Sequence, residues 1–260
     1  MAKRPSILVV NDDGITAPGI NALVECVEEL GDVVVVAPDK PQSGMGHAIT
    51  VSQLLRLKKV DLFGENIPAY QCTGTPADCV KLARDKVLHK MPDLVVSGIN
   101  HGSNASVNVI YSGTVSAAME GAMEGIPSIA FSLTDFSLEA DFSVAKQYVH
   151  TIVKYALEKG IPGETLLNVN IPNLPAEEIK GIYPCRQALG YWKENFDRRQ
   201  DPSGKEYYWL VGDFVLTDKG EDTDIWALKN GYIAMVPIHY DFTAHHAIRY
   251  LKEWRINESS

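Results

Sequence analysis

The sequence of 260 residues predicts an α/β fold in three layers, with helices on both faces of a doubly wound, mostly parallel sheet. Short runs of β-branched residues alternate five times with segments whose apolar residues recur at helical spacing. The first strand, helix and second strand together take about 30 residues, a length typical of a parallel strand–helix–strand unit. Dense aromatic residues without a helical period predict a C-terminal β-hairpin extension.

The first unit begins at the N-terminus. Residues 6–10 form a compact apolar run that stops at the polar residues 11–14, as a buried strand stops in a loop. Between residues 19 and 30 the apolar positions follow a helical period, and Gly31 is a helix stop signal. Residues 33–37 repeat the buried-strand pattern, which completes the unit.

The later elements continue the alternation. A helix begins at Thr75, because Pro76 is suited to the first helical position and Asp78 can complete a capping box. Gly160 ends a longer helix. The predicted elements are helices at 75–88, 116–124 and 144–159 and strands at 94–97, 128–131 and 166–170.

The composition changes near residue 181, where aromatic residues become frequent. Two extended segments, about 181–192 and 206–217, flank a polar stretch at 195–205 and predict a long hairpin. We therefore divide the chain into a Rossmann-like core, 1–180, and a segment 181–260 that carries the hairpin and serves in oligomerisation. The end of the chain returns to the α/β pattern, with a helix at 223–230, a strand at 232–238 and a helix after Thr243.

Charge and composition exclude several classes of partner. The chain has 24 Lys and Arg against 33 Asp and Glu, a net charge of −9, which provides no general attraction for a nucleic-acid polymer or an anionic membrane. The four cysteines form no C-x-x-C pair, as expected for reduced thiols. No secretion signal and no apolar run of about 18 residues is visible. These features predict a cytoplasmic protein.

A pair of carboxylates follows the first predicted strand. Asp12 and Asp13 lie where ligands collect in an open parallel sheet, at the carboxyl ends of the strands. Adjacent carboxylates repel each other unless a cation or protons compensate them, and oxygen ligands suit Mg²⁺, Mn²⁺ or Ca²⁺. The alternative is that these residues only form a turn and a helix cap.

Two further loops bring polar side chains to the same edge. The loop at 41–47 contains Ser43 and His47 among glycines that permit close approach of a ligand, although its G-x-G is a poor dinucleotide fingerprint. The loop that follows strand 94–97 contains Asn100 and His101. A plain flexible loop remains the alternative for the first of them.

A helix start supplies the fourth element. Ser112, Gly113 and Thr114 precede the small-residue helix, so hydroxyl groups and free backbone N–H groups gather at a helix N-terminus, which favours phosphate binding. An ordinary helix cap is the alternative. The histidines near the C-terminus lack partners at a zinc-like spacing, so no metal role is expected for His239, His245 and His246.

Five motifs follow one another along the first half of the chain. They are Asn11-Asp12-Asp13-Gly14; Ala37-Pro38-Asp39 with Ser43-Gly44-x-Gly46-His47; Gly74-Thr75-Pro76-x-Asp78-Cys79-Val80; Ser97-Gly98-Ile99-Asn100-His101-Gly102; and Tyr111-Ser112-Gly113-Thr114-Val115. In this order they resemble the motifs of the SurE family of survival proteins. The resemblance covers most of residues 6–131 and continues weakly through Thr223-Asp224 and Gly231.

The resemblance implies a phosphomonoesterase that hydrolyses nucleoside 5′-monophosphates, often with 3′-nucleotides and polyphosphate as further substrates. It implies one divalent metal ion per subunit, Mg²⁺ or Mn²⁺. Carried onto matching positions, the metal ligands are Asp12, Asp13, Ser43 and Asn100. The family commonly has a Leu-Gly pair after the residue that matches Asn104, so the different sequence here puts phosphate contacts of Asn104 and Ser106 in doubt.

The expected reaction is hydrolysis. Asp12 holds or deprotonates the attacking water, and either His101 or His47 protonates the leaving oxygen. The phosphate oxygens meet Asn104, Ser112, Gly113 and Thr114. Two alternatives remain open: an aspartate-nucleophile phosphatase, although the usual D-x-D spacing is missing, and a sensor that binds metal and nucleotide without turnover.

The resemblance also bears on assembly, because SurE proteins form dimers or tetramers whose C-terminal portions reach across or exchange between subunits. Aromatic side chains on a hairpin need a partner surface, since a two-stranded hairpin is marginal by itself. We expect a homodimer or homotetramer, with interface anchors at Trp192, Tyr207 and Trp209.

Overall fold

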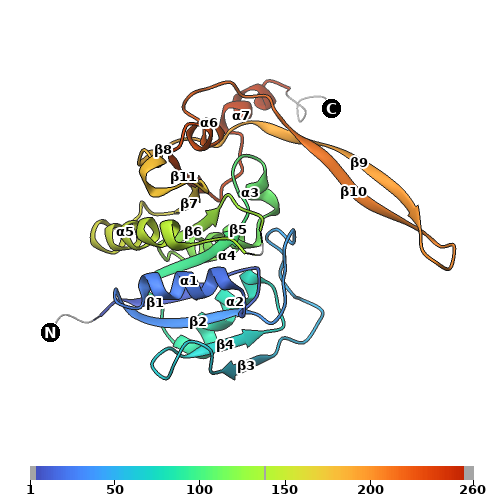
Figure 1. Ribbon diagram of the computed structural model, residues 1–260. Helices are drawn as coiled ribbons and strands as arrows, with labels where there is room; N and C mark the ends of the chain where they lie inside the picture. Colours follow the sequence, from blue (N-terminus) through green and yellow to red (C-terminus); the bar gives the residue numbers. More distant parts are fainter. Residues whose placement is uncertain (1–3, 138, 255–260) are drawn as a thin grey trace, which may run out of the picture.

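The computed structural model describes residues 4–137 and 139–254. A nine-stranded sheet forms the centre, and a two-stranded hairpin stands apart from it (Figure 1). The predicted α/β class and the hairpin extension are confirmed. The strands of the sheet, in spatial order, are β3 (Leu57–Val60), β4 (Ala69–Cys72), β2 (Asp32–Pro38), β1 (Ser6–Val10), β5 (Leu94–His101), β6 (Ser128–Leu133), β7 (Thr165–Ile171), β11 (Ile233–His239) and β8 (Ile182–Pro184).

Helices cover both faces of the sheet and complete the three layers (Figure 1). Alternate residues of β1 separate the two cores: Ile7 and Val9 belong to the apolar cluster under α1 and α5, whereas Leu8 and Val10 belong to the cluster under α2. The helical segments are α1 (Pro18–Val27), α2 (Pro76–Leu82) with the π-helical turn η1 (Ala83–Leu88), α3 (Asn108–Tyr111), α4 (Gly113–Met123), α5 (Ser143–Lys159), the 3₁₀ turn η2 (Ala176–Glu178), α6 (Asp224–Lys229) and α7 (His245–Lys252).

The chain order reverses between β1 and β5. From β1 the chain passes through α1 to β2 on one side, while β5 pairs with β1 on the other side. All three strands are parallel, so their carboxyl ends open at one edge of the sheet. Such a switch point is the place where an open α/β sheet binds ligands.

Sequence patterns missed the strands β3 and β4. They have four residues each, and β3 carries Lys58 and Lys59 on an exposed strand that pairs antiparallel at the edge of the sheet. Charged residues are common on edge strands, where they prevent pairing with other chains. Short length and charge leave no apolar period from which a strand could be predicted.

The position predicted for the first hairpin strand was wrong. Residues 182–184 form β8 in the main sheet, and the hairpin strand β9 (Gly190–Gln200) extends through the polar stretch to pair antiparallel with β10 (Glu206–Leu216). The turn is confined to residues 201–205, where Asp201 Oδ1 accepts hydrogen bonds from the backbone N–H groups of Ser203 and Lys205. Both faces of β9 are largely exposed, so polar side chains can be accommodated on this strand without being buried.

The division of the chain at residue 180 stays a prediction. In the structure, β8 and β11 of the second segment continue the sheet of the first, and the hairpin is the part that projects (Figure 1). Within the described residues, no helix combines the length and apolar character needed to span a membrane.

Helix α1 packs closely against β5 near the switch point, and a substitution at Gly19 tests how tight this packing is. A Cβ atom on Gly19 would lie 2.0 Å from the carbonyl oxygen of Ile99. Alanine normally favours a helix by up to about 1 kcal/mol over glycine, but overpacking costs about 1–3 kcal/mol. We therefore expect Gly19→Ala to lower the free energy of unfolding in urea denaturation.

The matched control is Gly163→Ala, because a Cβ atom there meets no atom within 4 Å. It should leave the urea midpoint nearly unchanged. A Gly19→Ala variant as stable as the control would show that the helix can move away from the sheet at no cost.

Candidate functional site

The predicted site residues meet at the switch point, around a cavity of about 250 Å³. They come from the ends of β1 and β5, from the loop after β2 and from the start of α4. The cavity is lined by Asp12, Ser43, Asn100, His101, Asn104 and Ser112, among others. Three further predicted residues contact these lining side chains: Asp13 contacts His101, and both Gly113 and Thr114 contact Asp12.

The carboxylate of Asp12 is held by the start of α4. Thr114 Oγ1 donates a hydrogen bond of 2.5 Å to Asp12 Oδ1. A Cβ atom on Gly113 would lie 2.6 Å from the Asp12 Cβ atom, so only glycine leaves room for this approach. The carboxylate therefore sits against a helix N-terminus, where partial positive charge is concentrated.

Burial, followed by the neighbouring charge of Asp13, raises the pKa of Asp12 to about 6, against the lowering effect of hydrogen bonds from the Thr114 hydroxyl and backbone. Only 4% of Asp12 is exposed. The ionised pair is thus unfavourable in the folded protein unless a positive charge lies next to it. Such a pair is typical of a site built for a cation.

Asp13 is bound to His101. Its Oδ2 atom lies 3.2 Å from His101 Nδ1 and accepts a longer hydrogen bond, 3.3 Å, from the His101 backbone N–H. The imidazole also packs edge to face against Phe142, with ring centroids 5.1 Å apart. The position of the ring is therefore fixed, and its Nε2 atom is buried without a hydrogen-bond partner in the described part of the chain.

His47 has a different environment. Its Nε2 atom lies 3.0 Å from Glu120 Oε2 on α4, and Lys81 Nζ on α2 binds the other oxygen of Glu120 at 2.5 Å. The contacts with His47 and Lys81 lower the pKa of Glu120 against the effect of burial, which is the largest single influence. His47 is tied to the side of α4, so the geometry favours His101 over His47 as the proton donor at the cavity.

The donor atoms suit a hard cation. Asn100 Nδ2 donates to the backbone oxygens of His101 and Gly102, at 3.1 and 2.8 Å, which leaves the side-chain oxygen as the free acceptor. Ser43 is exposed and lines the same cavity. Over residues 4–137 and 139–254, no group of three or more His, Cys, Asp or Glu side chains is placed to hold a metal. The carboxylate pair would need hydroxyl and amide oxygens to complete a set for Mg²⁺ or Mn²⁺.

The four residues predicted to bind phosphate have unequal positions. Ser112 caps α4, with its hydroxyl accepting from Val115 N at 3.0 Å, and Gly113 lies in the first turn. Thr114 is fully buried and its hydroxyl is engaged by Asp12, so it supports the carboxylate from behind. Asn104 lines the cavity but donates to Ser132 Oγ at 2.8 Å. Phosphate binding by all four stays a prediction.

Buried polar residues that were not predicted from the sequence hold the loop after β5, which contains Asn104. Asn170 Oδ1 accepts from the backbone N–H of Asn104 at 2.8 Å, and Asn168 Nδ2 donates to the Asn104 carbonyl oxygen at 2.9 Å. Both side chains are fully buried in β7. Asparagines inside an otherwise apolar strand are a signal that could have revealed them, because buried amides need partners.

Ser106 explains how the loop tolerates the missing glycine. Its φ angle is +54°, a left-handed conformation that is costly for most residues other than glycine. Asp224 Oδ2 accepts from the Ser106 backbone N–H at 2.7 Å, and the Ser106 hydroxyl donates to Ala188 O at 2.9 Å. Contacts with Asp224 at the start of α6 and with Ala188 just before β9 therefore stabilise the loop without glycine.

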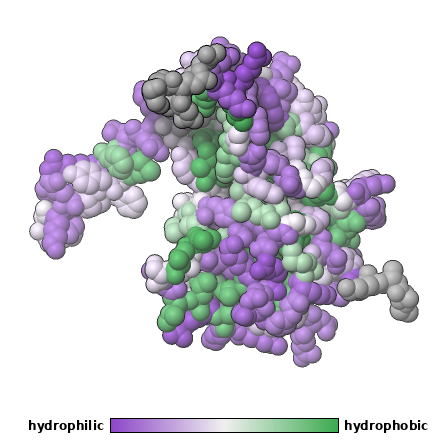
Figure 2. All heavy atoms as spheres, turned by 180° about the vertical axis from the view of Figure 1, so that it is seen from behind, coloured by the Kyte–Doolittle hydropathy of each residue, from purple (hydrophilic) through white to green (hydrophobic). Residues whose placement is uncertain are grey.

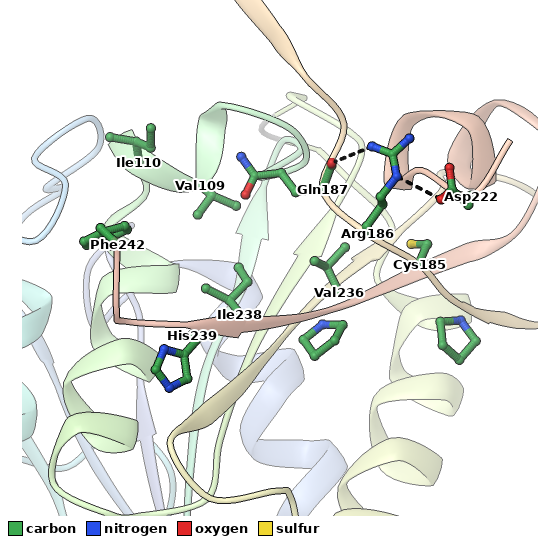
Figure 3. A pocket seen from close by; sticks show the side chains of 12 residues that line it. Val109, Ile110, Cys185, Arg186, Gln187, Asp222, Val236, Ile238, His239 and Phe242 are labelled. Carbon is green, nitrogen blue, oxygen red and sulfur yellow. Dashed lines mark hydrogen bonds and ion pairs between the residues drawn. The ribbon is translucent and has the colours of Figure 1, made fainter. Parts of the chain in front are cut away.

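A larger hollow of about 710 Å³ lies elsewhere, between α3 and β11 (Figure 3). Its walls are mainly apolar, with Val109, Val236 and Ile238 among them, and its one drawn ion pair joins Arg186 Nε and Asp222 Oδ2 at 2.8 Å. It contains neither carboxylate of the pair. Size alone does not mark the site of chemistry in this molecule.

The raised pKa of Asp12 predicts how stability depends on pH without metal. Below about pH 4 the carboxyl is protonated in both states, and as pH rises through about 6 the folded state loses up to about 3 kcal/mol relative to the unfolded state. We expect Asp12→Asn to avoid this loss and to unfold at higher temperature than the wild type in EDTA at pH 7.5. Thermal unfolding measured by circular dichroism checks this.

The difference in melting temperature should shrink towards pH 4, and Asp61→Asn, which changes an exposed carboxylate, should show no such pattern. An Asp12→Asn variant that is equally or less stable than the wild type in EDTA at pH 7.5 would mean that the buried charge is compensated by the protein itself.

Comparisons with known proteins agree with this geometry. A family described as survival protein SurE matches residues 7–194. A protein named 5′-nucleotidase SurE from Christiangramia forsetii is 58% identical over 257 residues, covering 98% of this chain and 99% of the relative. One of the same name from Flavobacterium psychrophilum is 56% identical over 255 residues, covering 98% and 99%.

The fold is also shared with a solved structure. The crystal structure of the Sure protein from Aquifex aeolicus superposes with a TM-score of 0.82 at 46% sequence identity, covering 96% of this chain and 99% of that one. The match includes the region of the carboxylate pair and the four loops around it. The chain therefore belongs to the SurE family.

Proposed function

We propose that this chain hydrolyses nucleoside 5′-monophosphates to nucleoside and phosphate with one divalent ion, Mg²⁺ or Mn²⁺, held by Asp12, Asp13, Ser43 and Asn100. The relatives from C. forsetii and F. psychrophilum are named 5′-nucleotidases, and as a 5′-nucleotidase of the SurE family this chain is a hydrolase. The main observation in support is the pair of adjacent carboxylates, Asp12 buried and Asp13 partly buried, beside a helix N-terminus at the switch point. Activity on 3′-nucleotides and polyphosphate, and a cytoplasmic location, stay predictions.

The residues around the cavity have separable roles in this reaction. When bound, the cation would polarise a phosphoryl oxygen and favour ionisation of a water molecule. Asp12, whose carboxylate lines the cavity, accepts the proton of the attacking water. Asp13 orients His101, whose Nε2 atom donates a proton to the leaving ribose oxygen. The N-terminus of α4, with Ser112 and Gly113, stabilises the phosphate oxygens.

Two alternatives lead to different outcomes. An aspartate nucleophile would form a covalent phosphoenzyme, but Asp12 is held from behind by Thr114 and Asp13 is held by His101. A sensor would bind a nucleotide without releasing phosphate. Turnover with and without a chelator separates the sensor from the enzyme.

The test is phosphate release from a panel of 5′- and 3′-mononucleotides, polyphosphate and sugar phosphates, with Mg²⁺, Mn²⁺ or EDTA. We expect 5′-mononucleotides to be hydrolysed and EDTA to abolish the activity. Asp13→Asn should lower turnover at least about a hundredfold, which is about 3 kcal/mol of transition-state stabilisation, because it removes ligand charge and keeps the shape. Asp61→Asn is the control, since that carboxylate is exposed.

Near-wild-type turnover of Asp13→Asn at saturating metal would exclude this pair as the metal site. Binding of nucleotides without phosphate release, in wild-type protein supplied with either metal, would favour the sensor.

The hairpin supports a homodimer or homotetramer. It projects from the body of the molecule (Figure 1), and Figure 2 shows one green, apolar patch on an arm that is otherwise purple or pale. Tyr207 and Trp209 lie on one face of β10, and Trp209 is 57% exposed. Trp192, the third anchor predicted from the sequence, lies at the root and donates from Nε1 to Asn108 Oδ1 at 2.9 Å. Exposed aromatic surface of this extent favours burial against another copy.

A shortened hairpin tests this proposal. Replacing residues 195–211 by Asn-Gly joins Glu194 to Gly212, which are paired across the hairpin, and retains its root. We expect light scattering to show an oligomer for the intact chain and a smaller species for the shortened one. A fully active wild-type monomer at micromolar concentration, or an unchanged mass after shortening, would contradict a role of the hairpin in assembly.

A further inference from the structure

We infer that Phe136 and Trp192 bind the base of the nucleotide, so that the outer part of the cavity is a nucleobase site. The inference rests on the proposed function. Aromatic side chains from three separate elements line the cavity that contains Asp12: Tyr111 from α3, Phe136 from the loop after β6, and Trp192 from β9. Their convergence on one cavity distinguishes them from isolated exposed aromatic residues, which are common on protein surfaces.

The indole of Trp192 is held in place before any ligand binds. Its Nε1 atom donates to Asn108 Oδ1 at 2.9 Å, and its ring lies 5.7 Å from Phe214, the residue paired with it across the hairpin. The side chain remains 39% exposed. A flat ring whose orientation is already fixed binds a planar ligand at a low cost in conformational entropy.

Phe136 is presented by a tethered loop. Thr134 N donates to Ile171 O, and Asn173 Nδ2 donates to Asp135 Oδ2, each at 2.9 Å, so β7 and the residues after it hold the two residues that precede Phe136. Phe136 itself is 78% exposed. Phe136 is therefore a large apolar ring that is exposed to solvent, although the two residues before it are anchored.

The ring of Phe136 also lies against Gly102, just past the end of β5. A Cβ atom on Gly102 would be 2.2 Å from Phe136 Cε1, and Gly102 has a φ angle of +94° that favours glycine. Gly102 comes directly after His101. This contact places the aromatic ring next to the residues that handle the phosphate ester.

The arrangement matches the two chemical ends of a nucleoside monophosphate. Asp12 and Ser112 line the cavity where they would meet the charged phosphate, and the aromatic rings that line the same cavity would meet the base. Stacking on aromatic rings tolerates every base because each base has a π face. The site therefore favours nucleotides over sugar phosphates without strong selection among the bases.

The experiment compares adenosine 5′-monophosphate with ribose 5-phosphate, which has the same ester and no base. For the wild type with saturating Mn²⁺, kcat/KM should be higher for the nucleotide. Phe136→Leu and Trp192→Leu should each reduce the ratio of the two kcat/KM values about tenfold or more, the scale of one lost stacking contact. Trp192→Phe should restore part of that ratio.

Phe196→Leu is the control for the hairpin, because Phe196 lies on the same strand and face as Trp192 but does not line the cavity. It should leave the ratio unchanged. Because Phe136 is outside the hairpin, its variant decides the matter if Trp192→Leu also alters the mass seen by light scattering. Phe136 is mostly exposed, so its replacement should leave the fold intact, which circular dichroism verifies.

The outcomes separate the two proposals. Equal losses for both substrates, or an unchanged ratio in Phe136→Leu, would overturn the nucleobase site while leaving the proposed hydrolysis in place. A wild type that releases phosphate from ribose 5-phosphate but from no mononucleotide would overturn both. A wild type that releases no phosphate from either substrate would overturn the proposed function itself. The base site would then be tested by tryptophan fluorescence, which adenosine 5′-monophosphate should quench in the wild type but not in Trp192→Leu.

Discussion

The burial of one carboxylate, Asp12, directly beside a second, Asp13, is the constraint on which the site depends. Burial and the charge of Asp13 raise the pKa of Asp12 to about 6, so ionisation has a cost that the fold only partly offsets. The offset comes from the Thr114 hydroxyl and the start of α4, which approaches closely because residue 113 is glycine. A cation beside the two carboxylates would offset the remaining cost of ionising them, and it would lie in the cavity that Asp12 lines.

The sheet topology makes this arrangement possible. The carboxyl ends of β1 and β5 are neighbours only because the chain order reverses between them. The loop that carries Ser43 is then fastened to the helices around it: Thr75 Oγ1 donates to Ala48 O at 2.7 Å, and His47 contacts Glu120. Residues far apart in sequence thereby hold one loop against α2 and α4, which limits how far Ser43 can move from Asp12.

The hairpin would link the proposed assembly to the site. Its outer part exposes aromatic residues, while its root places Trp192 in the cavity wall through the hydrogen bond to Asn108. A partner that fixed the hairpin would also fix one wall of the proposed base site. Substrate preference and assembly would then depend on the same strand, β9.

The sequence by itself determined the α/β alternation and the location of the polar loops, because strand and helix periods are local properties of the chain. Apolar runs such as residues 6–10 and 128–131 predict buried strands, and both are strands in the structure, with Asp12 and Asp13 following the first of them at an edge of the sheet. The motifs around these residues also indicated the family. Short or exposed strands were beyond this reasoning, as β3 and the polar part of β9 show, since neither buries an apolar face.

Only the tertiary structure decided the roles of individual side chains, because those roles depend on which partner lies within hydrogen-bond distance. The sequence could not choose between His47 and His101, but Glu120 holds the first and Asp13 orients the second at the cavity. It placed Thr114 at phosphate, whereas the folded chain turns that hydroxyl towards Asp12. No sequence pattern singled out Phe136, because the role proposed for its exposed ring depends on Trp192, which is distant in sequence but lines the same cavity.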